Sequence, residues 1–471
     1  MKILYHRQLI YLLFRWACSL FFLLMVTACA LGPDYRRPTI EVAEHYRIPH
    51  AEGESIANLP WWELFQDKVL QQLIQQALQE NKDLKRAIAS IEEHQARLSI
   101  ARMDFAPQLE TNINAPVMGR MGGFPLPGFA TPFNYFGQVN MSWEIDIWGR
   151  IRRSTQAALA ELIAQEANRR AIVLSLVGAV AQGYFDLLQL DKQLDLAQQV
   201  LHSWEESVAI SDAQLHQGLI SRLENDQIQA ERANAAAKVA TLGREMLQKE
   251  NELSLLLGKS SNSVLRGFSI NEQWFPPEIP AGLPAELLDR RPDVLRDEQL
   301  LVAATARIGA TKAARLPRIS LTGFLGVASP SLSNLLLSNS QFGAGGLGLA
   351  APILNARALG YEQKAVEAQA KQAIAQYEQT ALIAFKEVED ALVAIRTVKD
   401  QYKAHQEQVK ALQSVLQIAD LRYQGGLTSY VDVLLAKRSL FDAETVLVSI
   451  QRFHLVALVQ LYKALGGGWA P

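Results

Sequence analysis

Residues 388–423 read VEDALVAIRTVKDQYKAHQEQVKALQSVLQIADLRY, and every seventh position of this stretch carries an apolar or aromatic side chain. The members of this seam are Val388, Ile395, Tyr402, Val409, Leu416 and Tyr423. A seven-residue period is typical of a helix that packs lengthwise on other helices, and a strand, whose side chains alternate, cannot carry it. The surrounding stretch from Ile353 to Ala470 contains no proline, so the pattern predicts very long helical elements.

The seam is interrupted at residues 424–428, which read QGGLT. Gly425 and Gly426 permit the left-handed backbone that ends a helix, and Thr428 can cap the next one. The pattern therefore predicts a helical hairpin with its tip near residue 426. At about 1.5 Å per residue, the arm from Asn355 to Tyr423 would be roughly 100 Å long, far longer than an ordinary helix.

A second copy of this design lies upstream, between Phe133 and Phe275, where proline is again absent. Its seam consists of Val180, Leu187, Leu194, Leu201 and Val208, and it breaks at Gln217 and Gly218. A shift of 207 residues places Gln217 on Gln424, Gly218 on Gly425, Ser221 on Thr428 and Arg150 on Arg357. A shift of 210 places Asp83, Arg86, Ala96, Arg97 and Pro107 on Asp293, Arg296, Ala306, Arg307 and Pro317. These identities indicate a duplicated unit of roughly 200 residues.

The composition excludes several classes of function. The chain has 46 basic and 48 acidic residues, so no nucleic-acid partner is predicted. Cys18 and Cys29 are the two cysteines, which excludes a disulfide framework. Residues 343–348 match G-x-G-x-x-G formally, but Pro352 follows where a dinucleotide site needs a helix. The eight histidines lack metal-site spacing and no nucleophile motif is present, so we expect no enzyme activity, cofactor or metal site.

The N-terminus has a basic flank followed by an apolar run from Trp16 to Ala28. This run is too short to span a bilayer comfortably, and it predicts a cleaved signal peptide at residues 1–28. Residues 26–29, VTAC, resemble a bacterial lipobox, although Val26 stands where leucine is usual. This resemblance implies a palmitate-bearing lipid on Cys29 and, because Ala30 follows, sorting to the outer membrane. A lipid-anchored arm is expected at 29–60.

Four segments have the alternating pattern of strands: about 108–115, 136–147, 318–327 and 341–351. The first follows a helical pattern that runs from about Glu63 to Phe105 and ends at Pro107. The expected order is a first repeat at 61–258, a proline-rich linker at 259–284, a second repeat at 285–465 and a tail at 466–471. Residues 289–293, DRRPD, are typical of a helix start with solvated charges.

The strands alone fit either a soluble sheet or a lipid-exposed barrel. A lipid anchor and helices too long for a globule favour the barrel. Because no backbone group can stay unpaired in hydrocarbon, a four-stranded sheet in a membrane must close through other copies of itself. Bacterial barrels start at about eight strands, so the chain would have to oligomerise.

A set of motifs spans the first part of the chain: residues 29–38 (CALGPDYRRP), Trp61, Trp62, Phe65, Asp67, Asn81 and Leu84. Together they resemble the outer membrane factor family, in particular the OprM/NodT branch of efflux lipoproteins, which is related to TolC. The resemblance covers both repeats. It implies a mixed fold in which a periplasmic α-helical coiled-coil barrel continues into a transmembrane β-barrel, with three chains and twelve strands. It also implies an exit duct that acts with a periplasmic adaptor and an inner membrane RND pump.

Two other functions share parts of this pattern. The exit duct of a type I protein secretion system has the same fold. A coiled-coil scaffold tethered by lipid would have the same helices but would not conduct ions.

Acidic residues near the predicted tips are candidates for a periplasmic gate. Glu224 and Asp432 each lie six residues after a glycine, which we expect to place them almost two turns into a returning helix. Both would also be favourable as charges near a helix N-terminus. Residues 430–436, YVDVLLA, resemble the constriction of TolC-like tunnels, which favours a gate role for Asp432, whereas the two readings stay open for Glu224.

The same resemblance extends the gate to neighbouring residues. Several family members have a second aspartate where this chain has Leu435, so closure is expected to depend on packing by Val431 and Leu435. Arg438 is a candidate partner for an acid or a solvated residue. The tips, which are expected to bind the adaptor, are Gln217, Gly218, Gln424, Gly425 and Gly426.

Overall fold

The computed structural model describes residues 30–41, 46–47, 60, 65–114, 135–273, 287–329 and 331–467. The predicted signal peptide and Cys29 lie outside the described residues, as do Trp61 and Trp62. The chain forms two compact units. One consists of Met1–Thr39, Ser90–Gln165 and Arg296–Glu378, and the other of Ile40–Ala89, Glu166–Leu295 and Gln379–Pro471. Each unit therefore takes segments from both predicted repeats.

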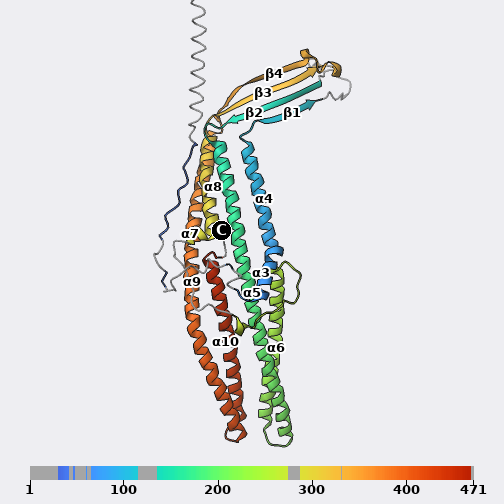
Figure 1. Cartoon of the computed structure of the whole chain (residues 1–471), viewed down its shortest axis with the longest axis vertical. Coiled ribbons are helices and arrows are strands. Elements are labelled where there is room, and N and C mark those ends of the chain that lie inside the picture. Colours follow the sequence, from blue (N-terminus) through green and yellow to red (C-terminus); the bar gives the residue numbers. More distant parts are fainter. Residues whose placement is uncertain are drawn as a thin grey trace, which may run out of the picture. The chain divides into compact units, whose positions relative to one another are not determined.

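The first unit contains one antiparallel sheet. Its strands are β1 (Gln108–Asn114), β2 (Tyr135–Ile145), β3 (Arg318–Ser329) and β4 (Gln341–Ala350), which lie side by side in chain order (Figure 1). The register pairs Leu109 with Met141, Met141 with Gly323, and Gly323 with Gly345. These bounds differ from the expected ones by at most two residues.

The two faces of this sheet differ sharply in polarity. Residues that are paired across the strands share a face, so the register assigns every strand position to one side. One face carries Leu109, Ile113, Val139, Met141, Trp143, Leu321, Leu325, Leu347 and Leu349. Many of them are open: Ile113 is 78% exposed and Leu325 is 75% exposed. The opposite face carries mainly polar or small side chains, including Glu110, Asn112, Gln138, Asn140, Thr322 and Gly346.

Two helical hairpins follow the strands. The first consists of α5 (Arg150–His216, 67 residues) and α6 (Arg222–Leu256, 35 residues). The second consists of α9 (Ala356–Gln424, 69 residues) and α10 (Tyr430–Ala464, 35 residues) (Figure 1). The predicted seams form their inner faces, since Val180, Leu187 and Val388 are fully buried.

The structure corrects the register between the two tips. Gly218 and Gly426 both have φ of 69°, the left-handed conformation that ends a helix. They lie 208 residues apart, and so do the starts of α6 and α10. The shift of 207 that placed Gly218 on Gly425 was therefore wrong at the tips, because α9 is two residues longer than α5.

Each repeat also begins with a pair of helices. The first repeat has α3 (Lys68–Glu80) and α4 (Lys82–Met103), and the second has α7 (Leu287–Arg290) and α8 (Pro292–Ala314). The single helix expected from Glu63 to Phe105 was therefore wrong, because Asn81 interrupts it. Asn81 Oδ1 accepts from the Leu84 amide at 3.0 Å, and Asn81 Nδ2 donates to the Leu256 carbonyl at 3.0 Å. Asn81 thus starts α4 and ties it to the end of α6.

Arg291 has the corresponding position in the second repeat and binds the end of α10. It donates to the Ala464 carbonyl at 3.1 Å, to Asp293 at 2.6 Å and to Glu387 at 2.6 Å. Arg291 is only 6% exposed, so the expectation of solvated charges at residues 289–293 was wrong for this residue. Its guanidinium needs three acceptors at once because a buried cation without partners is costly.

The largest core lies in the second unit, where faces of α3, α5 and α10 pack together around Tyr184, Leu187, Leu458 and Leu461. Helices α5 and α10 each contain an 18-residue window that is apolar enough to span a membrane, and 56% and 44% of these windows are buried. Both helices contribute buried residues to this core, including Leu187 of α5 and Leu458 of α10. Asp67 lies at its edge and accepts from Tyr184 Oη at 2.8 Å, the Phe268 amide at 3.1 Å and Gln273 at 2.9 Å.

The start of the described chain is fixed to the first unit. The Leu31 amide donates to the Trp148 carbonyl at 3.1 Å, directly after β2. Arg153, on α5, donates to Leu31 O at 3.2 Å and to Asp34 at 2.7 Å. Tyr35 and Arg37 both bind Glu298 of α8, at 2.8 and 3.0 Å. Residues 31–37 are therefore held as a strap across α5 and α8.

Candidate functional site

The first turn of α10 contains Asp432. This helix begins after Ser429, whose side chain makes no capping hydrogen bond. Thr428, which was expected to cap it, instead donates its hydroxyl hydrogen to the Asp432 carboxylate. The Thr428 cap was therefore wrong, because the cap position falls on the next residue. The depth of almost two turns was also wrong: Asp432 and Glu224 both lie in the first turn, where unpaired backbone N–H groups favour a negative charge.

The face of α10 that carries Asp432 is open in the single chain. Val431 is 38% exposed and Leu435 is 58% exposed, and Asp432 and Arg438 are exposed as well. Positions 431, 435 and 438 lie three and four residues apart, on one side of the helix. The buried residue Val433 faces the other way, into the hairpins. We call residues 431, 432, 435 and 438 the α10 strip; the described chain leaves it uncovered.

Arg438 lies at one end of this strip, beside a cavity of about 240 Å³. Glu231 and Lys238 of α6 and Asp442 of α10 also line the cavity. Among the described residues, Arg438 makes no ion pair. Its guanidinium is therefore available to a group outside this chain.

Lys437, which sequence reasoning missed, ties α10 to α5 beside the same cavity. Its Nζ lies 5.0 Å from the centre of the Trp204 ring and donates to Ser203 Oγ at 2.9 Å. Burial lowers the pKa of Lys437, although Asp420 and Glu206 oppose the shift. The α10 strip is thus held on a firmly packed helix.

Glu224 has the equivalent position in α6 but different surroundings. Its amide donates to the N-cap hydroxyl of Ser221 at 3.2 Å. Its side chain is half-buried. Burial raises the pKa values of Tyr423 and Tyr430, and the nearby Glu224 carboxylate adds to this effect. Glu224 is therefore less exposed than Asp432, and it lies on α6 and not on the α10 strip.

The two hairpins pack on each other just before their tips. Trp204 of α5, Ile228 of α6, and Tyr430 and Val433 of α10 form a buried cluster. The rings of Tyr423 and Tyr430 lie 4.9 Å apart at its edge. This packing fixes the start of α10, and with it Asp432, relative to the first hairpin.

Both tips are solvent-exposed turns. Gln217, Gly218, Gln424, Gly425 and Gly426 are all exposed. Gly426, and not Gly425, has the left-handed backbone, so the conformational role assigned to Gly425 was wrong. A side chain on Gly425 would meet its nearest neighbour, the Leu421 carbonyl oxygen, at 3.4 Å.

A leucine follows the left-handed glycine in each turn. The Leu219 amide donates to the Gln214 carbonyl at 2.9 Å, and the Leu427 amide donates to the Arg422 carbonyl at 2.8 Å. Leu219 is 69% exposed and Leu427 is 73% exposed. An apolar residue at this position usually packs back on the last turn. Both leucines are instead largely exposed. The sequence analysis did not single them out, although a leucine follows the glycine in both turns.

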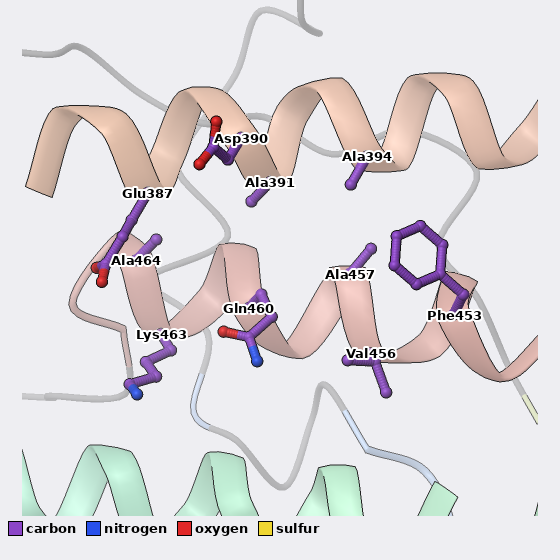
Figure 2. A pocket seen from close by; sticks show the side chains of 10 residues that line it. All are labelled: Glu387, Asp390, Ala391, Ala394, Phe453, Val456, Ala457, Gln460, Lys463 and Ala464. Atoms are coloured by element: carbon purple, nitrogen blue, oxygen red, sulfur yellow. The ribbon is translucent and has the colours of Figure 1, made fainter. Parts of the chain in front are cut away.

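A further cavity of about 240 Å³ lies between α9 and α10. Figure 2 shows its alanine-lined walls, with Glu387 and Lys463 near one end and Phe453 at the other. It contains none of the predicted site residues. Among the described residues, no group of three or more His, Cys, Asp or Glu side chains could hold a metal ion.

The comparisons agree with this architecture. The model of the family described as "Outer membrane efflux protein" matches residues 73–259 and again 283–467, once in each repeat. The chain belongs to this family. It is 33% identical over 451 residues to the cation efflux system protein CusC of Escherichia coli O6:H1, covering 95% of this chain and 97% of that protein. It is 35% identical over 461 residues to the solvent efflux pump outer membrane protein SrpC of Pseudomonas putida, covering 96% and 98%.

A solved structure supports the same conclusion. The open state of the Neisseria gonorrhoeae MtrE outer membrane channel superposes with a TM-score of 0.82 at 31% identity, covering 93% of this chain and 98% of that one. The prediction of a tandem, mainly helical efflux channel protein with a four-stranded sheet is confirmed. So is its location in the outer membrane, where this efflux family acts.

Proposed function

We propose that this efflux family member is the trimeric exit duct of a tripartite efflux system, which carries small molecules passively across the outer membrane. The observation that carries the proposal is the sheet. Its apolar face is exposed and its other face is polar, as expected for a wall between lipid and water. Within the described residues, β1 pairs only with β2 and β4 only with β3.

These free edges argue for oligomerisation. A backbone N–H or C=O group without a partner costs several kcal/mol in hydrocarbon, roughly as much as a lost hydrogen bond in an apolar medium. Pairing β4 of one copy with β1 of the next satisfies both edges. Three copies would give a closed barrel of twelve strands, in keeping with the family resemblance.

The strap supports a lipid anchor at Cys29. Leu31, two residues after Cys29, is bonded to Trp148 at the junction of β2 and α5. A lipid on Cys29 would thus enter the membrane close to where the barrel begins. In Cys29→Ser, incorporation of radioactive palmitate should be lost while the protein stays in the membrane fraction. Undiminished label would refute this assignment.

The helical tips are the proposed adaptor contacts, through Gln217, Gly218 and the turn at residues 424–426. Leu219 and Leu427 add apolar side chains to them. The α10 strip is the proposed periplasmic gate: three copies of Asp432 and Leu435 would converge where the second hairpins meet. An RND-type inner membrane pump would supply the energy, and no chemistry would occur in the duct.

The relatives are named for different cargoes, CusC for cations and SrpC for solvents. Purified trimers reconstituted into planar bilayers test the duct itself, because a tethered scaffold gives no conductance. Co-purification then separates the transport systems. Recovery of a proton-driven pump with its adaptor supports efflux, whereas recovery of an ABC exporter supports protein secretion.

A further inference from the structure

Three phenylalanines form a cluster on the polar face of the sheet. Phe136 of β2, Phe324 of β3 and Phe342 of β4 share this face by register, because Phe324 is paired with Asn140 and Phe342 is paired with Gly326. The ring centres of Phe136 and Phe342 lie 5.7 Å apart, and those of Phe324 and Phe342 lie 5.8 Å apart. Both separations are in the range of attractive aromatic contacts.

The cluster crosses three strands because of one glycine. Phe136 and Phe342 lie on strands that are separated by β3, so their rings meet above it. Gly326 is the β3 residue beneath them, and a Cβ there would lie 2.5 Å from Cζ of Phe342. The missing side chain therefore creates the space in which the Phe342 ring lies.

This position is unusual for large apolar side chains. Aromatic girdles of outer membrane barrels lie on the lipid-facing side, but these rings lie on the opposite side. They are not sealed from solvent, since Phe324 is 36% exposed and the other two are half-buried. Their mutual packing therefore leaves apolar surface open on the face that, under the proposed function, lines the water-filled path.

The neighbours of the cluster are polar and mostly uncharged. The Gln138 amide donates to Asn140 Oδ1 on the same face. Glu110 stands in the register row of Phe324, two strands away. The rings thus offer a stacking surface, the amides offer hydrogen bonds, and the carboxylate disfavours anions.

We propose that Phe136, Phe324 and Phe342 form a transient binding site for planar aromatic solutes, neutral or cationic, on the wall of the duct. This inference rests on the proposed function and assigns to it a class of cargo. Solutes with a ring and one polar group fit best, because they can stack on Phe342 and bind the Gln138 or Asn140 amide. Three copies of the site would surround the path at one level of the barrel.

The test uses open-channel current through reconstituted full-length trimers, with 2-naphthol as the probe and its saturated counterpart decahydro-2-naphthol as the matched solute. In the wild type, 2-naphthol should halve the current at a lower concentration than the saturated alcohol. In Phe342→Ala, the half-blocking concentration of 2-naphthol should rise about two- to tenfold, which corresponds to one aromatic contact. Phe342→Leu keeps an apolar side chain, and should weaken block by 2-naphthol more than block by the saturated alcohol.

Leu347→Ala is the matched control, since Leu347 is 70% exposed on the opposite face of the sheet. This variant should leave the half-blocking concentrations of both solutes unchanged. If the Phe342→Ala and Phe342→Leu trimers conduct and are half-blocked by 2-naphthol at the wild-type concentration, this inference is overturned and the proposed duct is not. If neither the wild-type trimers nor trimers of the proposed gate variant Leu435→Ala conduct, the duct is contradicted, and the binding site with it.

Discussion

The two repeats make the same contact at the end of a helical hairpin with different side chains. In the first, the neutral side chain of Asn81 binds the Leu256 carbonyl at the end of α6. In the second, Arg291, 210 residues later, binds the Ala464 carbonyl at the end of α10, and it brings Asp293 and Glu387 with it. The contact is the same, but one repeat uses an amide and the other a buried ionic cluster. The two repeats thus share the position of this contact but differ in the interactions that stabilise it.

The tips differ in the same way. Glu224 and Asp432 occupy equivalent positions, yet Glu224 is half-buried and Asp432 is exposed. We infer that Glu224 mainly stabilises the packing near the first tip, whereas Asp432 serves the proposed gate.

The largest effect is expected at Arg291. Arg291→Met should lower the stability of the protein by about 2–4 kcal/mol, because it removes a buried guanidinium that binds three acceptors and leaves the carboxylates of Asp293 and Glu387, which are 29% and 44% exposed, without their cation. Asn81→Ala should cost less, about 1–3 kcal/mol, since it leaves one neutral carbonyl without its donor. Denaturant unfolding of the purified trimers measures both. Equal losses would contradict the proposed difference between the repeats.

The ionic cluster should also make stability depend on pH. Burial alone would raise the pKa of Asp293, but the hydrogen bonds and charge of Arg291 outweigh it and hold the pKa below its ordinary value. A depressed pKa stabilises the fold above the unfolded-state value of about 3.9 and loses this contribution as pH falls through the folded-state value. Asp293→Asn should therefore flatten the loss of melting temperature below about pH 4. Part of the loss should remain in this variant, because the pKa of Asp67 is also lowered.

The glycines that end α6 and α10 are expected to have the next largest effects. Both Gly258 and Gly466 have left-handed backbones, so alanine should cost roughly 1–2 kcal/mol at either site. A Cβ at Gly258 would also overlap the backbone carbonyl of Glu80, whereas at Gly466 the nearest atom, the Arg290 carbonyl oxygen, lies 3.1 Å away. Gly258→Ala should therefore lower the trimer melting temperature more than Gly466→Ala. The reverse order would show that the end of α6 tolerates a side chain better than the end of α10.

The sequence was sufficient for the long hairpins and the strands because both depend on local periodicity. The seam at Val388 and Val409 and the alternation in residues 341–350 can each be recognised within one segment. It was insufficient for Arg291 and Asp67, whose partners lie up to about 200 residues away and leave no local pattern. The tip offset was misjudged for a related reason: Gly425 and Gly426 are both glycines, and only the backbone shows which one is left-handed.

A smaller effect is expected at the tip itself. Gly426→Val forces a β-branched residue into a left-handed backbone, which should cost roughly 1–2 kcal/mol locally and displace Leu427. Gly425→Val has no such penalty. Adaptor co-purification should therefore fall for Gly426→Val and much less for Gly425→Val, while both trimers assemble. Similar losses in both variants would mean that the glycine conformation does not matter for docking.

The smallest change in stability, but the most specific change in function, is expected at Asp432. Because Asp432 is exposed and its partner is the adjacent Thr428, Asp432→Ala should cost less than about 1 kcal/mol. If the α10 strip closes the resting duct, this variant and Leu435→Ala should each raise single-channel conductance, and high salt should open the wild type little because closure is largely apolar. Glu224→Ala is the matched control in the other repeat, and it should leave conductance unchanged because Glu224 is half-buried, whereas the α10 strip is exposed. A rise in conductance with Glu224→Ala but not with Asp432→Ala would place the gate on the first hairpin instead, because the two carboxylates lie in the first turns of α6 and α10.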